Sequence, residues 1–163
     1  MTDIVKVEVN EIKELAELAK EIWFEYWHSI LTLGQIYYMV NKFQSELALT
    51  EQIERENYSY YFLVENGEKI GYFGVAPEEG YFFLSKLYIK KDYRGKGFGK
   101  FAFEYIKKLA QENGFSKIRL TVNKQNFKTI LIYEKWGFKT HHALVTRIGN
   151  GYEMDDYLME YTL

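Results

Sequence analysis

Glycines alternate with larger, mostly cationic side chains in residues 94–100, whose sequence is Arg-Gly-Lys-Gly-Phe-Gly-Lys. A run of this kind between a strand and a helix is typical of a site for anions. The first N–H groups of the helix have no backbone partner, the helix dipole is positive at that end, and glycine has no Cβ to keep a phosphate away. The run therefore predicts that the protein binds a phosphorylated ligand.

The segments on either side of this run supply the strand and the helix that an anion site needs. Residues 81–89 are mostly aromatic and aliphatic and predict a buried strand. Apolar residues recur at helical spacing from Phe98 to Ala110, and this helix is expected to end at Gly114, which suits a left-handed cap. Residues 117–123 alternate Ile, Leu and Val with polar residues, which predicts a second strand.

The same patterns divide the remainder of the chain into short helices and strands. Asn66-Gly67 predicts a hairpin turn, and residues 76–80, which hold the only proline, predict another. This order predicts one domain over residues 1–163, with three layers and an α/β or α+β architecture around a mixed sheet. The further elements expected are helices at 12–26, 35–43, 50–57 and 129–135, and strands at 4–9, 58–65, 70–75, from 138 onward and at 156–162.

Composition excludes several classes of site. The chain has 163 residues, of which 47% are hydrophobic and 27% charged, as in a folded domain. It has no Cys, which excludes a thiolate nucleophile and a zinc–thiolate site, and its three His residues show no metal-ligand spacing. The net charge of −2 argues against nucleic acid as a partner. With no bilayer-length apolar run and no signal-peptide pattern, a cytoplasmic protein without a membrane partner is expected.

Three kinds of phosphate loop resemble residues 94–100, and two of them fit poorly. A Walker A loop needs Ser or Thr after Gly-Lys, whereas Phe101 follows Gly99-Lys100 and the glycine spacing is one residue short. A dinucleotide loop matches residues 97–102, but the acidic residue expected about 20 positions later is missing from residues 117–124. Apart from these phosphate loops, residues 94–100 could also form a plain glycine-rich turn that binds no ligand.

The third kind of loop consists of Arg or Gln followed by x-x-Gly-x-Gly, and residues 94–99 match it. A second motif lies downstream, where residues 126–138 read Asn-Phe-Lys-Thr-Ile-Leu-Ile-Tyr-Glu-Lys-Trp-Gly-Phe. Together, the two motifs resemble those of the Gcn5-related N-acetyltransferases, the GNAT family, whose second motif is Asn-x-x-Ala-x-x-x-Tyr-x-x-x-Gly-Phe. Thr129 stands where Ala is usual. The resemblance covers residues 60–140 well and the N-terminal helices only in outline.

The resemblance implies a three-layer fold with a mixed, mostly antiparallel sheet that is splayed between the strand ending at Ile89 and the strand near Ile118 to Val122. It implies acetyl-CoA as cosubstrate and no metal. The pyrophosphate is expected on the backbone N–H groups of the glycine loop, and the pantetheine arm on the splayed strand edge and on an Asn amide. The cofactor-binding residues so implied are Leu87, Tyr88, Ile89, Arg94, Gly95, Lys96, Gly97, Phe98, Gly99, Lys100 and Asn126.

Acetyl transfer from a thioester to an amine needs a deprotonated amine, donors for the oxyanion and a proton for the departing thiolate. The resemblance implies that Tyr133 is the catalytic proton donor and that a backbone N–H of residues 87–89 faces the oxyanion. A phenol, whose ordinary pKa is about 10, stays protonated at neutral pH. Because the chain has no Cys, the expected route is direct attack in a ternary complex.

The acceptor side carries weaker signals. The aromatic segment 23–28 and Tyr37-Tyr38 are candidates for the wall of an amine pocket, although a helix packed on the sheet explains them equally well. Asp155 and Asp156 are expected either to face a cationic acceptor such as a polyamine or to lie in a solvated loop. A small amine or a peptide is therefore the expected acceptor, and a homodimer through the C-terminal strands follows from family analogy alone.

No general base stands out in the sequence. His28 is one candidate, Glu78 and Glu79 are expected to be solvated in a turn, and the pair 141–142 is expected to lie too far away. Two other functions stay open. One is a non-catalytic acyl-CoA-binding module on the same fold, and the other is an enzyme that uses a different acyl-CoA.

Overall fold

Seven strands form one mixed sheet in the order β1-β2-β3-β4-β5-β7-β6 in the computed structural model, which describes residues 1–163. Only the β4–β5 pair is parallel, and the other neighbours are antiparallel. The predicted α/β class with a mostly antiparallel mixed sheet is confirmed. The elements are β1 (Thr2–Lys6), α1 (Ile12–Trp27), α2 (Leu33–Phe43), α3 (Glu46–Arg55), β2 (Ser59–Glu65), β3 (Glu68–Glu78), β4 (Tyr81–Ile89), α4 (Phe98–Glu112), β5 (Lys117–Asn123), α5 (Phe127–Trp136), β6 (Lys139–Gly149) and β7 (Tyr152–Thr162).

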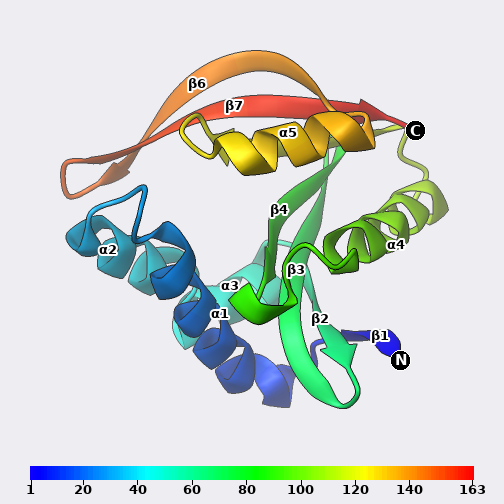
Figure 1. The fold of residues 1–163 in the computed structure, drawn as a ribbon, viewed down its shortest axis with the longest axis horizontal. Coiled ribbons are helices and arrows are strands. Elements are labelled where there is room, and N and C mark those ends of the chain that lie inside the picture. The colour runs from blue at the N-terminus through cyan, green and yellow to red at the C-terminus, as the bar shows by residue number, and fades with distance from the viewer.

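Helices cover both faces of the sheet, so the core has two parts (Figure 1). On one face, α1, α2 and α3 bury an aromatic cluster that includes Trp23 and Tyr60. On the other face, α4 and α5 pack Phe103 and Tyr133 against the central strands. Because successive strand residues point to opposite faces, Tyr60 and its neighbour Tyr61 enter different parts of the core.

The sheet opens between its two central strands. β4 and β5 pair only at Phe82–Ile118 and Phe83–Arg119, near the start of each strand. From there to Ile89 the edge of β4 that faces β5 has no strand partner, and Figure 1 shows the two halves of the sheet diverging. The expected splay is therefore confirmed.

A β-bulge in β4 lies where the strands part. Gly74 of β3 pairs with Lys86, and the next residue, Val75, pairs with Leu84, so that Ser85 is left as an extra residue. A bulge increases the local twist of a strand and interrupts its pairing. It therefore helps β4 to turn away from β5 at this level.

Some predicted boundaries were wrong. Strand β1 covers residues 2–6 rather than 4–9. Helix α3 begins at Glu46 rather than at residue 50, because the Ser45 side chain caps it by accepting a hydrogen bond from the Ala48 N–H at 3.2 Å. Strand β3 continues through Pro77, where a turn was predicted. The β2–β3 pairing ends at Ser59–Val75, so the missing N–H of Pro77 costs no bond to β2.

The structure contains no helix that combines the length and the apolar character needed to cross a membrane.

Candidate active site

A cavity of about 780 Å³ occupies the opening between β4 and β5. Its walls come from α1, β4, the glycine loop, β5, α5 and the β6–β7 hairpin, which are far apart in sequence. Leu87, Tyr88 and Ile89 line it along the unpaired edge of β4. This edge offers backbone donors and acceptors to an extended ligand, as an exposed strand does to a peptide.

The glycine loop forms one end of the cavity. The backbone N–H groups of residues 95–97 make no hydrogen bond within the protein, and α4 begins directly after them at Phe98. Gly95 and Gly97 have φ angles of 74° and 90°, which lie in the left-handed region that favours glycine. Free N–H groups at the positive N-terminal end of α4, a helix of 15 residues, form a site for an anion.

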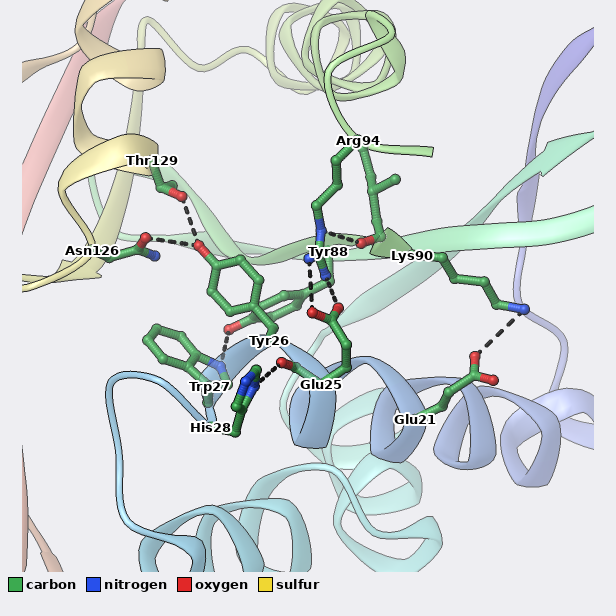
Figure 2. Close-up of polar contacts among 11 residues, drawn as sticks. Glu21, Glu25, Tyr26, Trp27, His28, Tyr88, Lys90, Arg94, Asn126 and Thr129 are labelled. Atoms are coloured by element: carbon green, nitrogen blue, oxygen red, sulfur yellow. Dashed lines mark hydrogen bonds and ion pairs between the residues drawn. The ribbon is translucent and has the colours of Figure 1, made fainter. Parts of the chain in front are cut away.

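Arg94 lines the cavity and is held in place by α1, so its role as a cofactor contact stays a prediction. Its guanidinium donates two hydrogen bonds to the Glu25 carboxylate, at 2.5 and 3.2 Å, and its Nε donates to the carbonyl oxygen of Ile89 at 2.8 Å (Figure 2). The same group lies over the Tyr26 ring, 4.9 Å from its centre. Arg94 thereby fixes the end of β4 and the start of the glycine loop to α1, and its charge is balanced.

Of the other predicted loop residues, some line the cavity and some do not. Gly95, Gly97, Gly99 and Lys100 line the cavity. The Lys96 side chain lies outside it, beside Tyr93, and Phe98 packs against the core. Lys96 and Phe98 therefore stay predicted cofactor contacts through their backbone N–H groups, and not through their side chains.

Helix α1 also reaches the opposite wall of the cavity. The Tyr26 hydroxyl donates to Oδ1 of Asn126 at 2.8 Å and lies 2.8 Å from the Thr129 hydroxyl at the start of α5 (Figure 2). Asn126 is only 7% exposed, and its Nδ2 makes no hydrogen bond within the protein. Tyr26 therefore orients the amide so that its donor end is the free end.

We expect the Tyr26→Phe variant to unfold at a temperature about 2–8 °C lower than the wild type. The substitution leaves the buried Asn126 oxygen without a donor, which costs about 1–3 kcal/mol. Thermal unfolding measures the effect. Tyr37→Phe is the matched control, because Tyr37 is 57% exposed and its hydroxyl makes no hydrogen bond. Equal melting temperatures for the two variants would show that the Tyr26–Asn126 contact contributes nothing to stability.

Tyr133 lies on α5, where it belongs to the core and also lines the cavity. The ring packs 5.5 Å from that of Trp136 and 5.6 Å from that of Phe138, and the residue is 8% exposed. The hydroxyl has no hydrogen-bond partner in the protein, and the residue lines the cavity. Burial, followed by the nearby Tyr26, raises the pKa of Tyr133 above its ordinary value. The phenol is therefore protonated at neutral pH and free to donate.

None of the base candidates named from the sequence reaches the cavity. His28 is exposed, and its Nδ1 lies 2.5 Å from the Glu25 carbonyl oxygen (Figure 2). Glu78 and Glu79 are exposed at the β3–β4 turn, and residues 141–142 lie on the exposed strand β6. None of these side chains lines the cavity.

Asp156 does line the cavity, which is one of the two placements expected for the acidic pair, whereas Asp155 does not. Asp156 was expected near the start of a strand or in a loop, whereas β7 begins four residues earlier, at Tyr152. Asp156 is 5% exposed and makes no hydrogen bond or ion pair. Burial, and then the neighbouring Asp155, raises the pKa of its carboxyl to about 6. The sequence predicted a strand only from residue 156 onward. A strand over residues 152–162 would have placed Asp156 inside it and not at its start.

The aromatic segment of α1 forms part of the cavity wall. Trp23, Tyr26 and Trp27 line the cavity, whereas Tyr37 and Tyr38 do not. Tyr38 instead donates to the carbonyl oxygen of Ile148 at 2.7 Å, which ties α2 to β6. Of the residues predicted to form the wall of an amine pocket, those on α1 therefore lie at the cavity, and Tyr37 and Tyr38 on α2 lie outside it.

Lys86 brings a cation into the cavity without a carboxylate partner. Its Nζ donates to the Ser85 hydroxyl at 2.6 Å and lies 5.5 Å from the centre of the Tyr58 ring. Burial lowers the pKa of its ammonium to about 8. The cavity wall therefore includes a cation whose charge is partly lost near pH 8.

Comparison with known proteins identifies the class. Residues 13–138 match the model of the acetyltransferase (GNAT) family, so the chain belongs to that family. As a member, it is an acetyl-CoA-dependent N-acetyltransferase, and the resemblance seen in its two motifs is confirmed. The unpaired N–H groups of the loop and the open edge of β4 suit the pyrophosphate and the amides of such a cosubstrate.

Individual relatives are similar along most of the chain. A spermidine N(1)-acetyltransferase of Thermoplasma acidophilum is 27% identical over 141 residues, which cover 84% of this chain and 88% of the relative. A probable spermine N(1)-acetyltransferase of Bacillus subtilis subsp. natto is 28% identical over 109 residues, with 61% and 72% covered. The crystal structure of the PaiA N-acetyltransferase of T. acidophilum in complex with coenzyme A superposes with a TM-score of 0.82 at 22% identity, covering 100% of this chain and 99% of that one.

Proposed function

We propose that the protein transfers an acetyl group from acetyl-CoA to a primary amine by direct attack in a ternary complex. One observation supports this proposal: glycines of the loop, residues of the unpaired β4 edge and Tyr133, whose hydroxyl has no partner in the protein, all line one cavity. An acetyl-cysteine intermediate is excluded because the chain has no Cys. The amine must therefore reach the thioester directly.

The chain offers a distinct group to each part of the cosubstrate. The N–H groups of residues 95–100 receive the pyrophosphate. Backbone groups of residues 87–89 pair with the amides of the pantetheine arm, as a neighbouring strand would. The free Nδ2 of Asn126 donates to a carbonyl of the same arm from the opposite wall, because Tyr26 already engages Oδ1.

Two groups of the chain act on the reacting atoms. A backbone N–H of residues 87–89 stabilises the oxyanion that forms when the amine attacks. The Tyr133 hydroxyl gives its proton to the departing thiolate and regains one from the new amide nitrogen. The raised pKa of Tyr133 keeps its hydroxyl protonated at neutral pH, so that a proton is available when the thiolate leaves.

The acceptor we propose is a polyamine or a similar small primary amine. Two relatives named for spermidine and spermine support this class, as does the carboxylate of Asp156 in the cavity. A peptide amine remains the alternative acceptor, although neither of these two relatives is named for a peptide. A homodimer through the C-terminal strands stays a prediction, with β6 as the outer edge of the sheet.

An acceptor screen tests the proposed function. The protein and acetyl-CoA are incubated with polyamines, amino acids, aminoglycosides and peptides, and the free thiol of coenzyme A is measured. We expect release with spermidine or spermine above the rate without acceptor. If acetyl-CoA binds and no amine in the panel releases thiol, the enzyme proposal fails and the alternative of a non-catalytic acyl-CoA-binding module stands.

We expect Lys86→Met to lower the KM for spermidine by about threefold to tenfold. Removing an unpaired cation from the cavity removes its repulsion of a polycation, which is worth about 1 kcal/mol at this exposure. Steady-state kinetics at pH 7 measure the effect, and it should shrink above pH 8, where Lys86 loses its charge. Lys91→Met, an exposed residue outside the cavity, is the control. An unchanged KM would mean that the bound acceptor does not approach Lys86.

A further inference from the structure

We infer that Asp156 is the residue that binds the ammonium group of the acceptor and removes its proton before attack. This inference rests on the proposed function and assigns the base that the sequence did not reveal. Asp156 is a catalytic residue in this sense, because its carboxylate contacts the attacking nitrogen. It lies outside both sequence motifs of the family, on strand β7 near the end of the chain.

The register of the sheet places Asp156 in the cavity. Strand β7 lies between β5 and β6, and Asp156 pairs with Asn123 of β5 and Leu144 of β6. At this position the two neighbouring strands cover its backbone, while the opening between β4 and β5 gives its side chain access to the cavity. The carboxylate is therefore held on a rigid element and not on a mobile loop.

The two consecutive Asp residues differ in their partners. Asp155 is exposed and forms an ion pair with Lys124, with 2.8 Å between Oδ1 and Nζ. Asp156 is 95% removed from solvent and makes neither an ion pair nor a hydrogen bond. A buried carboxylate without a partner is unfavourable unless a cation or a donor reaches it. The structure thus leaves a buried anionic group without a partner in a cavity whose proposed acceptor is a cation.

Asp156 also lies close to the groups that act on the thioester. All three of Asp156, Tyr88 and Tyr133 line the cavity, and the pKa of the Tyr88 phenol is raised by burial and, to a smaller extent, by Tyr133 and Asp156. Tyr88 thus lies within electrostatic range of both side chains, and its backbone belongs to the edge proposed to face the oxyanion. A nitrogen bound at Asp156 is therefore directed toward the region where the acetyl group is expected.

The charged and titratable groups around Asp156 are few. Burial and then Asp155 raise the pKa of its carboxyl, Lys124 lowers it, and Tyr88 of β4 lines the same cavity. With a pKa of about 6, the carboxyl is ionised at pH 7 to 8 and is a stronger base than an exposed Asp.

The proton balance of the reaction is simple. Asp156 takes one proton from R–NH3⁺, and the lone pair of R–NH2 forms the C–N bond to the acetyl carbon. The C–S bond then breaks and its electron pair leaves with sulfur, which takes the proton of Tyr133. The second proton of the nitrogen restores Tyr133, and Asp156 releases its proton to water.

The test compares Asp156→Asn with Asp155→Asn in two measurements. The first is the pH dependence of kcat/KM for spermidine between pH 5 and 9. We expect Asp156→Asn to lose about 10²-fold at pH 7.5 and to lack the acidic limb near pH 6 that the wild type shows. Asp155→Asn should keep its activity at pH 8 and move that limb to lower pH, because it removes a like charge and frees Lys124. An acidic limb that persists in Asp156→Asn overturns the inference.

The second measurement is calorimetric binding of spermidine to the protein saturated with coenzyme A, where no reaction occurs. We expect at least tenfold weaker binding for Asp156→Asn and no change for Asp155→Asn. Equal binding by both variants overturns the inference whatever the kinetics show. A wild type that binds spermidine through Asp156 but transfers no acetyl group contradicts the proposed function and leaves this site in place, so the two failures are distinguishable.

Melting temperatures show whether Asp156→Asn is folded. The pKa of Asp156 is raised, so the folded state holds more protons than the unfolded state, and the wild type loses stability as the pH rises from about 4 to 6. The neutral Asn removes this loss. We expect Asp156→Asn to melt several degrees above the wild type at pH 7.5 and close to it at pH 4.5. A lower melting temperature at pH 7.5 would contradict an unpaired carboxylate at this position.

Discussion

Replacing Tyr133 by Phe is expected to lower kcat for acetyl transfer by about 10²–10⁴-fold, the usual contribution of a general acid. The substitution removes one hydroxyl that has no partner in the protein, and it keeps the ring contacts with Trp136 and Phe138. The folded structure and the binding of acetyl-CoA should therefore stay nearly unchanged. Single-turnover kinetics with saturating acetyl-CoA and spermidine measure the chemical step without product release.

Tyr58→Phe provides the matched control for this variant. Tyr58 lines the same cavity, and burial raises the pKa of its phenol as it does for Tyr133. Tyr58 lies beside Lys86 on the acceptor side, away from α5. We expect Tyr58→Phe to keep kcat within a few fold. If Tyr133→Phe also keeps kcat within threefold, water supplies the proton of the thiolate and the role assigned to Tyr133 is wrong.

The segments around the glycine loop were predictable because local rules determine them. The expected strands 81–89 and 117–123 match β4 and β5 at both ends. Glycine supplies the left-handed conformations at the start of α4, where Gly97 has a φ of 90°, and after its end, where Gly114 has a φ of 80°. Turn chemistry and apolar periodicity act over a few residues, so a single sequence displays them.

The contacts that complete the site could not be predicted because they join distant segments. Glu25 and Arg94 are 69 residues apart in sequence, and Tyr26 and Asn126 are 100 apart. Periodicity predicted that helix α1 packs on the sheet, but not that its last turn reaches both walls of the cavity. The inward placement of Asp156 depends on where β7 begins and on its register, and shifting a strand by one residue would turn this side chain to the other face.

The glycine loop gives the other prediction with a large expected effect. We expect Gly97→Ala to weaken the binding of coenzyme A by about 10²–10³-fold. An added methyl group at this position meets no protein atom within 4 Å, and Gly97 lines the cavity, so we expect the methyl to occupy space proposed for the phosphate. It would separate the phosphate from the loop N–H groups, and each such charge-assisted hydrogen bond is worth about 1.5–3 kcal/mol.

Gly114→Ala separates this effect from simple loss of stability. Gly114 has nearly the same conformation, with a φ of 80° against 90° for Gly97, and it too has no protein atom within 4 Å of an added Cβ. Both substitutions force Ala into the left-handed region, which costs about 1–2 kcal/mol, so similar falls in melting temperature are expected. Only Gly97→Ala should lose affinity in calorimetric titration with coenzyme A. If both variants bind coenzyme A as tightly as the wild type, the pyrophosphate does not rest on the loop N–H groups. If both lose affinity alike, backbone strain transmitted through α4 accounts for the loss, because the two glycines lie at opposite ends of that helix.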